Sequence, residues 1–251
     1  MTWVLLRGLT REARHWGSLP QRLAEVTGMD QALALDLPGN GEFFVQASPR
    51  SARAMVGFAR WQLRAQGLQP PYSLLAMSLG GMVATAWAQQ YPHEVTRLVL
   101  INTSMRPYSG ISARLRPGNW LQLLLLAARW QDTDYAERVI HQLTCQQRAL
   151  RDQDLAAWSR IRSSAPVSTA NVWRQLWAAA RFRSAAAPPR CPTLVLSSAG
   201  DQLVHPLCSV RLAQAWQAEH HQHPWAGHDL PHDDAGWVCQ RLAGWSLAIV
   251  S

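Results

Sequence analysis

Short apolar runs recur along this chain, and stretches with helical character separate them. The runs lie at residues 3–6, 32–35, 72–76, 97–101 and 193–197, and a shorter, more polar one lies at 220–223. Most have leucine-rich or β-branched centres, as strands that are buried on both faces do. Helical candidates occupy most of the gaps, at 15–26, 52–66, 81–90, 208–217 and 235–247. This alternation predicts an α/β fold with a mostly parallel sheet flanked by helices.

The interval 105–187 interrupts this alternation. It holds several helical candidates and no convincing strand; the candidates lie at 121–128, 135–143, 155–161 and 172–182. A helical insertion between two strands of a parallel sheet is expected to cover the carboxyl ends of the strands, where ligands bind. We therefore expect a core made of residues 1–104 and 188–251, with residues 105–187 as a helical cap.

Ser78 is the first candidate for chemistry. It follows the run at 72–76 and has small residues two positions away on each side, Ala76 and Gly80. A sharp turn from a strand into a helix needs such residues around an exposed serine. Serine becomes a good nucleophile only when a base takes its proton and a carboxylate orients that base. Ser78 is thus a candidate nucleophile; capping of the following helix is the alternative interpretation.

Two later residues can supply the acid and the base. Asp201 comes after the run at 193–197, although turns and helix N-caps also favour aspartate. His228 comes after the run at 220–223, and we prefer it for that reason to the neighbouring histidines, His220, His221, His223 and His232. The chain order Ser, Asp, His is that of the α/β-hydrolases, whereas other serine-hydrolase folds use different orders.

Five segments together resemble a compact, capped α/β-hydrolase of the carboxylesterase kind, similar to the pimeloyl-ester carboxylesterase group. They are LLRGL at 5–9, DLPGNG at 36–41, MSLGG at 77–81, GD at 200–201 and GH at 227–228. The resemblance therefore extends over nearly the whole chain. It implies a catalytic triad of Ser78, His228 and Asp201, and it makes Asp36 a structural residue.

An oxyanion hole needs two backbone N–H donors. Leu79 is one candidate, because it follows the nucleophile at the start of a helix. The resemblance implies Leu9 as the second, and both residues would then contact the substrate. The chain departs from the family at Arg7, where a histidine is usual. We expect the site to tolerate this change, because the donor at Leu9 belongs to the backbone.

The resemblance implies a serine hydrolase that cleaves a carboxylic ester or thioester through an acyl-enzyme, with no cofactor. A lactonase, a carbon–carbon bond hydrolase and a cofactor-free lyase stay open, because the same triad can serve them. Haloalkane dehalogenases and epoxide hydrolases place an aspartate at the position of Ser78, which argues against both. An alternative of another class is a non-catalytic member of the fold that binds a small apolar ligand.

The composition argues against several other classes of function. The net charge is +8, and all 24 basic residues are arginine. The absence of lysine excludes Schiff-base, pyridoxal-phosphate and Walker-lysine chemistry. The arginines are scattered and accompany no nucleic-acid-binding motif, so we expect a small-molecule substrate and no nucleic-acid partner. The oligomeric state stays open.

Neither a metal site nor a membrane segment is expected. The four cysteines are widely spaced, and the histidines at 220–232 lack the helical spacing of metal ligands. The apolar run at 121–128 is too short to cross a bilayer. The N-terminal segment has neither the basic lead nor the long apolar centre of a signal peptide, so we expect a cytoplasmic protein.

Overall fold

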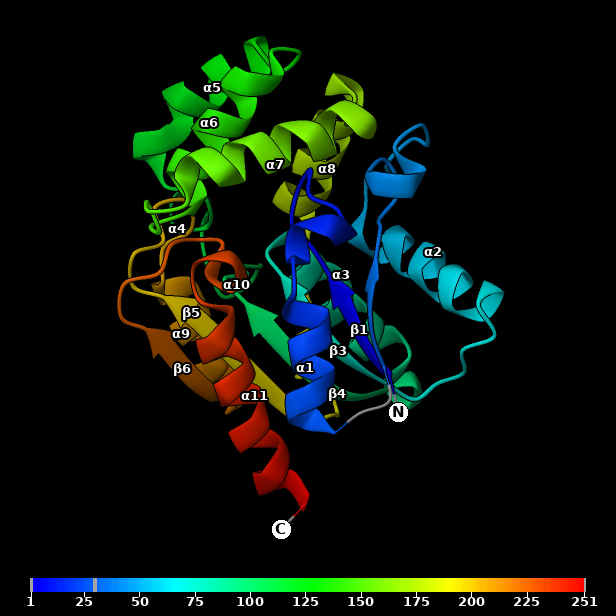
Figure 1. The fold of residues 1–251 in the computed structure, drawn as a ribbon. Coiled ribbons are helices and arrows are strands. Elements are labelled where there is room, and N and C mark those ends of the chain that lie inside the picture. The colour runs from blue at the N-terminus through cyan, green and yellow to red at the C-terminus, as the bar shows by residue number, and fades with distance from the viewer. Residues whose placement is uncertain (1, 29–30, 251) are drawn as a thin grey trace.

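A computed structural model describes residues 2–28 and 31–250, and it contains a central sheet with helices on both faces (Figure 1). Within the described residues the sheet has six strands in the order β2-β1-β3-β4-β5-β6, and each neighbouring pair is parallel. The strands are β1 (Thr2–Leu6), β2 (Gln31–Leu35), β3 (Tyr72–Met77), β4 (Val95–Ile101), β5 (Thr193–Ser198) and β6 (Glu219–His223). Parallel strands bring their carboxyl ends to one edge of the sheet.

The side chains of the central strands alternate between two apolar layers, because successive strand residues point to opposite faces. Leu74 of β3 packs with α2 (Ala52–Ala65), α3 (Leu79–Gln90) and α9 (Leu207–Trp216). Leu75, the next residue, packs on the other face with α1 (Leu19–Thr27) and α11 (Ala235–Val250). Burial of each such leucine contributes roughly 1.5–3 kcal/mol, so both layers stabilise the sheet that carries the candidate site.

A group of helices is inserted between β4 and β5. It consists of α4 (Ile111–Arg114), α5 (Trp120–Ala128), α6 (Thr133–Thr144), α7 (Arg151–Ser164) and α8 (Thr169–Arg181). Figure 1 shows α5, α6, α7 and α8 gathered at one end of the molecule, beyond the sheet. They have a small apolar cluster of their own, which includes Leu126, Trp130, Val139 and Val172. We call residues 111–181 the inserted helices.

The predicted strands are confirmed, each within two residues of its expected bounds. The predicted helix at 15–26 is wrong at its beginning, because residues 13–16 form a separate 3₁₀ turn. Gly17 then adopts a φ of +55°, which stops that turn, and α1 begins at Leu19. The short helices α4 and α10 (Leu230–Asp233) were not predicted.

Two smaller findings concern the cysteines and the apolar helices. All four cysteines are free thiols. In the described part of the chain, no helix has both the length and the apolar character that a bilayer crossing requires.

Candidate active site

Ser78 occupies a strained turn between β3 and α3. Its φ and ψ are +52° and −118°, a conformation that residues other than glycine rarely adopt. The backbone around it is fixed on both sides: the Ser78 N–H donates to the carbonyl of Ile101 at 3.0 Å, and its own carbonyl accepts from Oγ1 of Thr103 at 2.8 Å. Backbone strain held in place by neighbouring contacts is typical of functional positions.

Gly80 allows this turn to lie against the end of β1. A Cβ at position 80 would stand 2.3 Å from the carbonyl oxygen of Leu6 and 2.5 Å from that of Arg7. Both obstacles are backbone atoms, which cannot move aside as a side chain can. The small residue that the sequence places two positions after Ser78 is therefore required for the packing of α3 on β1.

The loop after β1 passes directly beside Ser78. A Cβ at Gly8 would lie 3.2 Å from Cβ of Ser78 and 3.7 Å from its Oγ. Leu9, the next residue, lines the same cavity as Ser78. Leu79 is buried at the first turn of α3, and its side chain is not part of that cavity wall. The amide of Leu79 nevertheless lies at the N-terminus of a helix, where the dipole favours negative charge.

His228 and Asp201 form a buried pair. Nδ1 of His228 lies 2.7 Å from Oδ2 of Asp201, and the residues are 3% and 1% exposed. The second oxygen of Asp201 accepts from the backbone N–H groups of Leu203 and Val204, at 2.8 and 2.9 Å. These two donors fix the carboxylate, so the carboxylate can in turn fix the tautomer and orientation of the imidazole.

The other histidines near the C-terminus have different partners. His220 contacts Oγ of Ser197, His221 contacts Glu219, and His223 contacts Asp234. His232 contacts Asp154 of α7. Among the described histidines of this segment, His228 is the one that is paired with Asp201.

One cavity of about 380 Å³ brings the candidate residues together. Ser78 and His228 both line it, and Asp201 lies behind the imidazole. Most of the remaining wall is apolar and comes from the inserted helices, including Leu123, Leu126, Leu143, Val172 and Leu176. A mostly apolar cavity with a few convergent polar groups is the usual form of a small-molecule site.

Asn102 is a site residue that the sequence analysis missed. It directly follows β4, and its side-chain amide donates to the carbonyls of His228 and Gly227, at 2.8 and 3.2 Å. Its side-chain oxygen accepts from the N–H of Ser198 at 3.0 Å. Asn102 therefore ties the segment that carries His228 to the end of β5. Its φ of +45°, unusual outside glycine, was not visible in the sequence.

The contact between Arg7 and Asp229 was also not predicted from the sequence. Nη1 and Nη2 of Arg7 donate to the two carboxylate oxygens of Asp229, at 3.0 and 2.5 Å. Both side chains are almost completely buried. Burial alone would raise the pKa of Asp229, but the Arg7 guanidinium beside it holds that pKa below its usual value. Arg7 directly follows a buried strand, and a charged residue in such a place needs a partner of opposite charge. That requirement was the one sign of this contact in the sequence.

The inserted helices are joined to the loop after β1 by polar contacts. Gln175 of α8 accepts from the N–H of Thr10 at 2.8 Å and donates to Oδ1 of Asn40 at 3.0 Å. Glu137 of α6 accepts from Arg11 of that loop at 2.6 Å and from Arg162 of α7 at 3.3 Å. These contacts fix the loop that contains Leu9 relative to the cavity wall.

Asp36 lies among backbone N–H groups and away from the cavity. Its carboxylate accepts from the N–H groups of Ala13 and Glu42, at 2.7 and 2.9 Å. Burial raises the pKa of this carboxyl. It joins two loops and does not line the cavity.

A family model described as the alpha/beta hydrolase fold matches residues 30–235. A search of curated proteins finds no match.

Several solved structures share the fold. An esterase from Thermogutta terrifontis is 21% identical with a TM-score of 0.76, over 100% of this chain and 91% of the esterase. A hydrolase from Pseudomonas aeruginosa is 19% identical with a TM-score of 0.76, over 100% of this chain and 89% of that protein. The enol-lactonase from Burkholderia xenovorans is 17% identical with a TM-score of 0.73, over 99% and 89% of the two chains.

Proposed function

Because the chain belongs to the α/β-hydrolase fold family, we propose that it is a serine hydrolase that cleaves a carboxylic ester or thioester. The observation that carries this proposal is that His228, which is paired with the buried Asp201, lines the same cavity as Ser78. A nucleophile, a base and an orienting carboxylate are the parts that acyl transfer through a serine requires.

In the proposed reaction, Oγ of Ser78 attacks the carbonyl carbon while His228 takes the hydroxyl proton. The tetrahedral intermediate collapses, the bond to the alcohol or thiol breaks, and His228 returns the proton to the leaving group. A water molecule then attacks the acyl-enzyme, again with His228 as base, and the carboxylic acid is released. Asp201 keeps Nδ1 of the imidazole protonated throughout, so Nε2 is the nitrogen that exchanges protons.

The negative oxygen of the intermediate needs preorganised donors, and each is worth roughly 10²–10³ in rate. We assign this role to the backbone N–H groups of Leu79 and Leu9. The position of Leu79 at the start of α3 supports the first assignment. The close approach of Gly8 to Ser78 supports the second, because Leu9 follows Gly8 in the same loop.

The apolar wall supports an apolar acyl group as the part of the substrate that enters the cavity. In this proposal residues 105–187 act as a cap, and leucine, valine and tryptophan side chains of the inserted helices surround the acyl chain. Burial of each methylene would contribute about 0.8 kcal/mol, so affinity should rise with acyl length until the cavity is filled.

The test is a matched panel of p-nitrophenyl esters and acyl thioesters of increasing acyl length. We expect hydrolysis to depend on acyl length and to be lost in Ser78→Ala. Ser197→Ala is the control, because Ser197 also contacts a histidine, His220 at 2.8 Å, but does not line the cavity. If no compound is hydrolysed while an apolar acyl compound still raises the Tm, the chain is a binding protein instead.

A further inference from the structure

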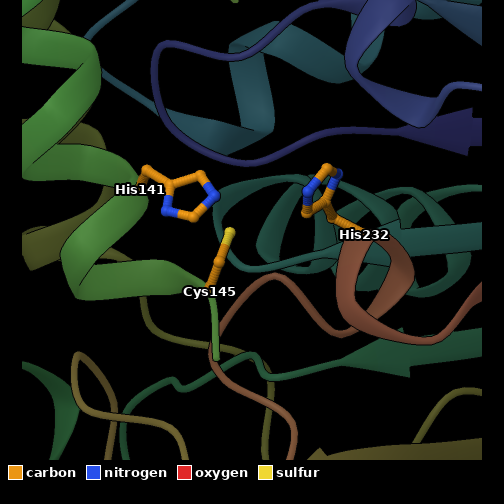
Figure 2. Close-up of side chains that lie close together, drawn as sticks. All are labelled: His141, Cys145 and His232. Carbon is orange, nitrogen blue, oxygen red and sulfur yellow. The ribbon is translucent and has the colours of Figure 1, made fainter. Parts of the chain in front are cut away.

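A second cluster of reactive side chains lies where the inserted helices meet α10. His141 belongs to the last turn of α6, Cys145 follows the end of that helix, and His232 belongs to α10. One ligand atom from each residue lies within 4.8 Å of the other two. Figure 2 shows the sulfur of Cys145 pointing toward the space between the two imidazole rings. None of the three has a role in the proposed hydrolysis.

Asp154 of α7 joins the two imidazoles of this cluster. Its Oδ2 lies 3.2 Å from Nε2 of His141 and 3.0 Å from Nε2 of His232. Zinc bonds to nitrogen and oxygen are about 2.0–2.1 Å, so ligand atoms of a tetrahedral zinc site are separated by about 3.3 Å. The two oxygen–nitrogen distances are therefore close to those of a zinc site, with the carboxylate as the fourth ligand.

We propose that His141, Cys145, Asp154 and His232 form a binding site for one zinc ion. Imidazole nitrogen, thiolate sulfur and carboxylate oxygen are the donors that zinc takes in proteins, usually four in a tetrahedron. A thiolate and a carboxylate also neutralise the two positive charges of the ion, so the occupied site would carry no net charge. That balance matters because an unpaired charge is costly in a buried place.

The spacing along the chain suits such a site. His141 and Cys145 are four residues apart at the end of α6, which places them on the same side of the helix. Both are fully buried, whereas the His232 side chain is 20% exposed and leaves a route by which an ion can enter. Among His141, Cys145 and His232, binding must shorten the longest separation, up to 4.8 Å, to about 3.5 Å, because zinc–sulfur bonds are about 2.3 Å.

Neighbouring contacts hold the two imidazoles in place. The ring of Trp158 lies against both of them, at centroid distances of 5.3 Å from His141 and 4.9 Å from His232. Among the described residues, Nδ1 of His141 is buried without a hydrogen-bond partner. Nε2 is therefore the nitrogen of His141 that makes polar contacts, and it is the one near Asp154.

An ion at this site would join α6 and α7 to the segment that carries His228. His232 lies four residues after His228, and the N–H of the intervening Asp229 donates to the carbonyl of Thr144 at 2.8 Å. Zinc would therefore fix the inserted helices, which form much of the cavity wall, against α10. This role is structural and does not depend on the hydrolase proposal.

The test measures metal binding directly. The purified protein is stripped with a chelator, dialysed, and titrated with zinc and, separately, with cobalt. We expect one zinc per chain and a Tm that rises by several degrees when zinc is added, because an ion that binds only the folded state stabilises it. Cobalt should give the thiolate-to-metal charge-transfer absorption and the intense visible bands of a tetrahedral sulfur-containing site.

Variants assign the ligands. Cys145→Ser and His232→Gln should each weaken zinc binding by roughly 100-fold or more, since even groups outside the ligand set change affinity 10–100-fold. Cys208→Ser is the control, because Cys208 is an equally buried thiol in α9 that does not belong to the cluster. Circular dichroism of the metal-free variants verifies that they fold.

The alternative is that Asp154 simply accepts hydrogen bonds from both imidazoles and no metal binds. Absence of tight zinc binding by the folded wild-type protein would establish that alternative and overturn the proposal. Zinc binding that survives in both Cys145→Ser and His232→Gln would overturn it as well, because the ion would then lie elsewhere.

Discussion

The guanidinium of Arg7 pairs with both carboxylate oxygens of Asp229, the residue directly after His228. The pair joins the loop after β1, which carries Leu9, to the segment that carries the candidate base. Arg7 also lies over the ring of Trp16, with its Cζ 4.8 Å from the ring centroid. The two halves of the proposed site are thus held to one another by a buried ion pair. A histidine at position 7 could not form the same two parallel contacts.

Removal of Arg7 should destabilise the protein strongly. In Arg7→Met the carboxylate of Asp229 stays buried without its partner, and we expect the free energy of unfolding to fall by about 3–5 kcal/mol. Urea denaturation monitored by tryptophan fluorescence measures the change. The double variant Arg7→Met/Asp229→Asn should be more stable than Arg7→Met, because it no longer buries a lone charge. Equal stabilities of the single and double variants would contradict this account of the pair.

Asp201→Asn tests the orienting carboxylate. The amide is nearly the same size, and its oxygen can still accept from Leu203 and Val204, so the fold should persist. The imidazole would take the wrong tautomer, and kcat for the best ester of the panel should fall by about 10⁴-fold. KM should change little, since Asp201 lies behind His228. A kcat within tenfold of the wild-type value, with an unchanged Tm, would show that Asp201 does not orient the base.

His15 should make stability depend on pH. Burial and the positive charges of Arg11 and Arg7 hold the pKa of His15 well below its usual 6.5. The unfolded chain therefore takes up a proton below pH ~6.5 that the folded chain does not, and stability falls as pH falls. The free energy of unfolding should therefore fall between pH 7 and 5, by at most about 1.4 kcal/mol for each pH unit below ~6.5.

Urea denaturation of the wild type and of His15→Gln at pH 7, 6 and 5 isolates that contribution. Stability of the variant should decline less steeply below pH 6.5 than that of the wild type, even if it is lower at pH 7. Parallel declines of the two proteins would mean that His15 is not the group responsible.

Leu176→Trp should change the preference for acyl length. Leu176 of α8 lines the cavity, and a larger side chain there reduces the space of about 380 Å³. We expect the optimum of the ester panel to shift to shorter acyl chains, with the longest esters losing the most kcat/KM. Trp177→Phe is the control, because Trp177 is the adjacent residue, is half exposed and does not line the cavity. An unchanged optimum in Leu176→Trp would place the acyl group outside this cavity.

The strands were predictable because parallel strands covered on both faces must be apolar at their centres, as residues 74–76 and 98–101 are. The beginning of α1 was not predictable, because it depends on the positive φ of Gly17. A glycine is compatible with many conformations, so its presence alone does not indicate that one. Asp201 and His228 were identified from chain order and from the strands that precede them. Their pairing at 2.7 Å depends on the tertiary structure, and no local sequence pattern predicts it.

Contacts between distant polar residues account for most of what the sequence did not predict. Asn102 and Arg7 each act on the segment at 227–229 from more than a hundred residues away. The cluster around Cys145 combines a helical spacing of four with a histidine from another helix, so no single segment of the sequence contains it. The spacing of His141 and Cys145 was the one part of this cluster that a local pattern could indicate.

Covalent labelling of the serine tests the central claim most directly. A fluorophosphonate probe is incubated with the protein, and the modified peptide is identified by mass spectrometry. This account predicts one label per chain, on Oγ of Ser78, and little labelling in His228→Ala, where no base remains to take the proton. Labelling of a different residue, or ester hydrolysis that persists at the wild-type rate in Ser78→Ala, would contradict it.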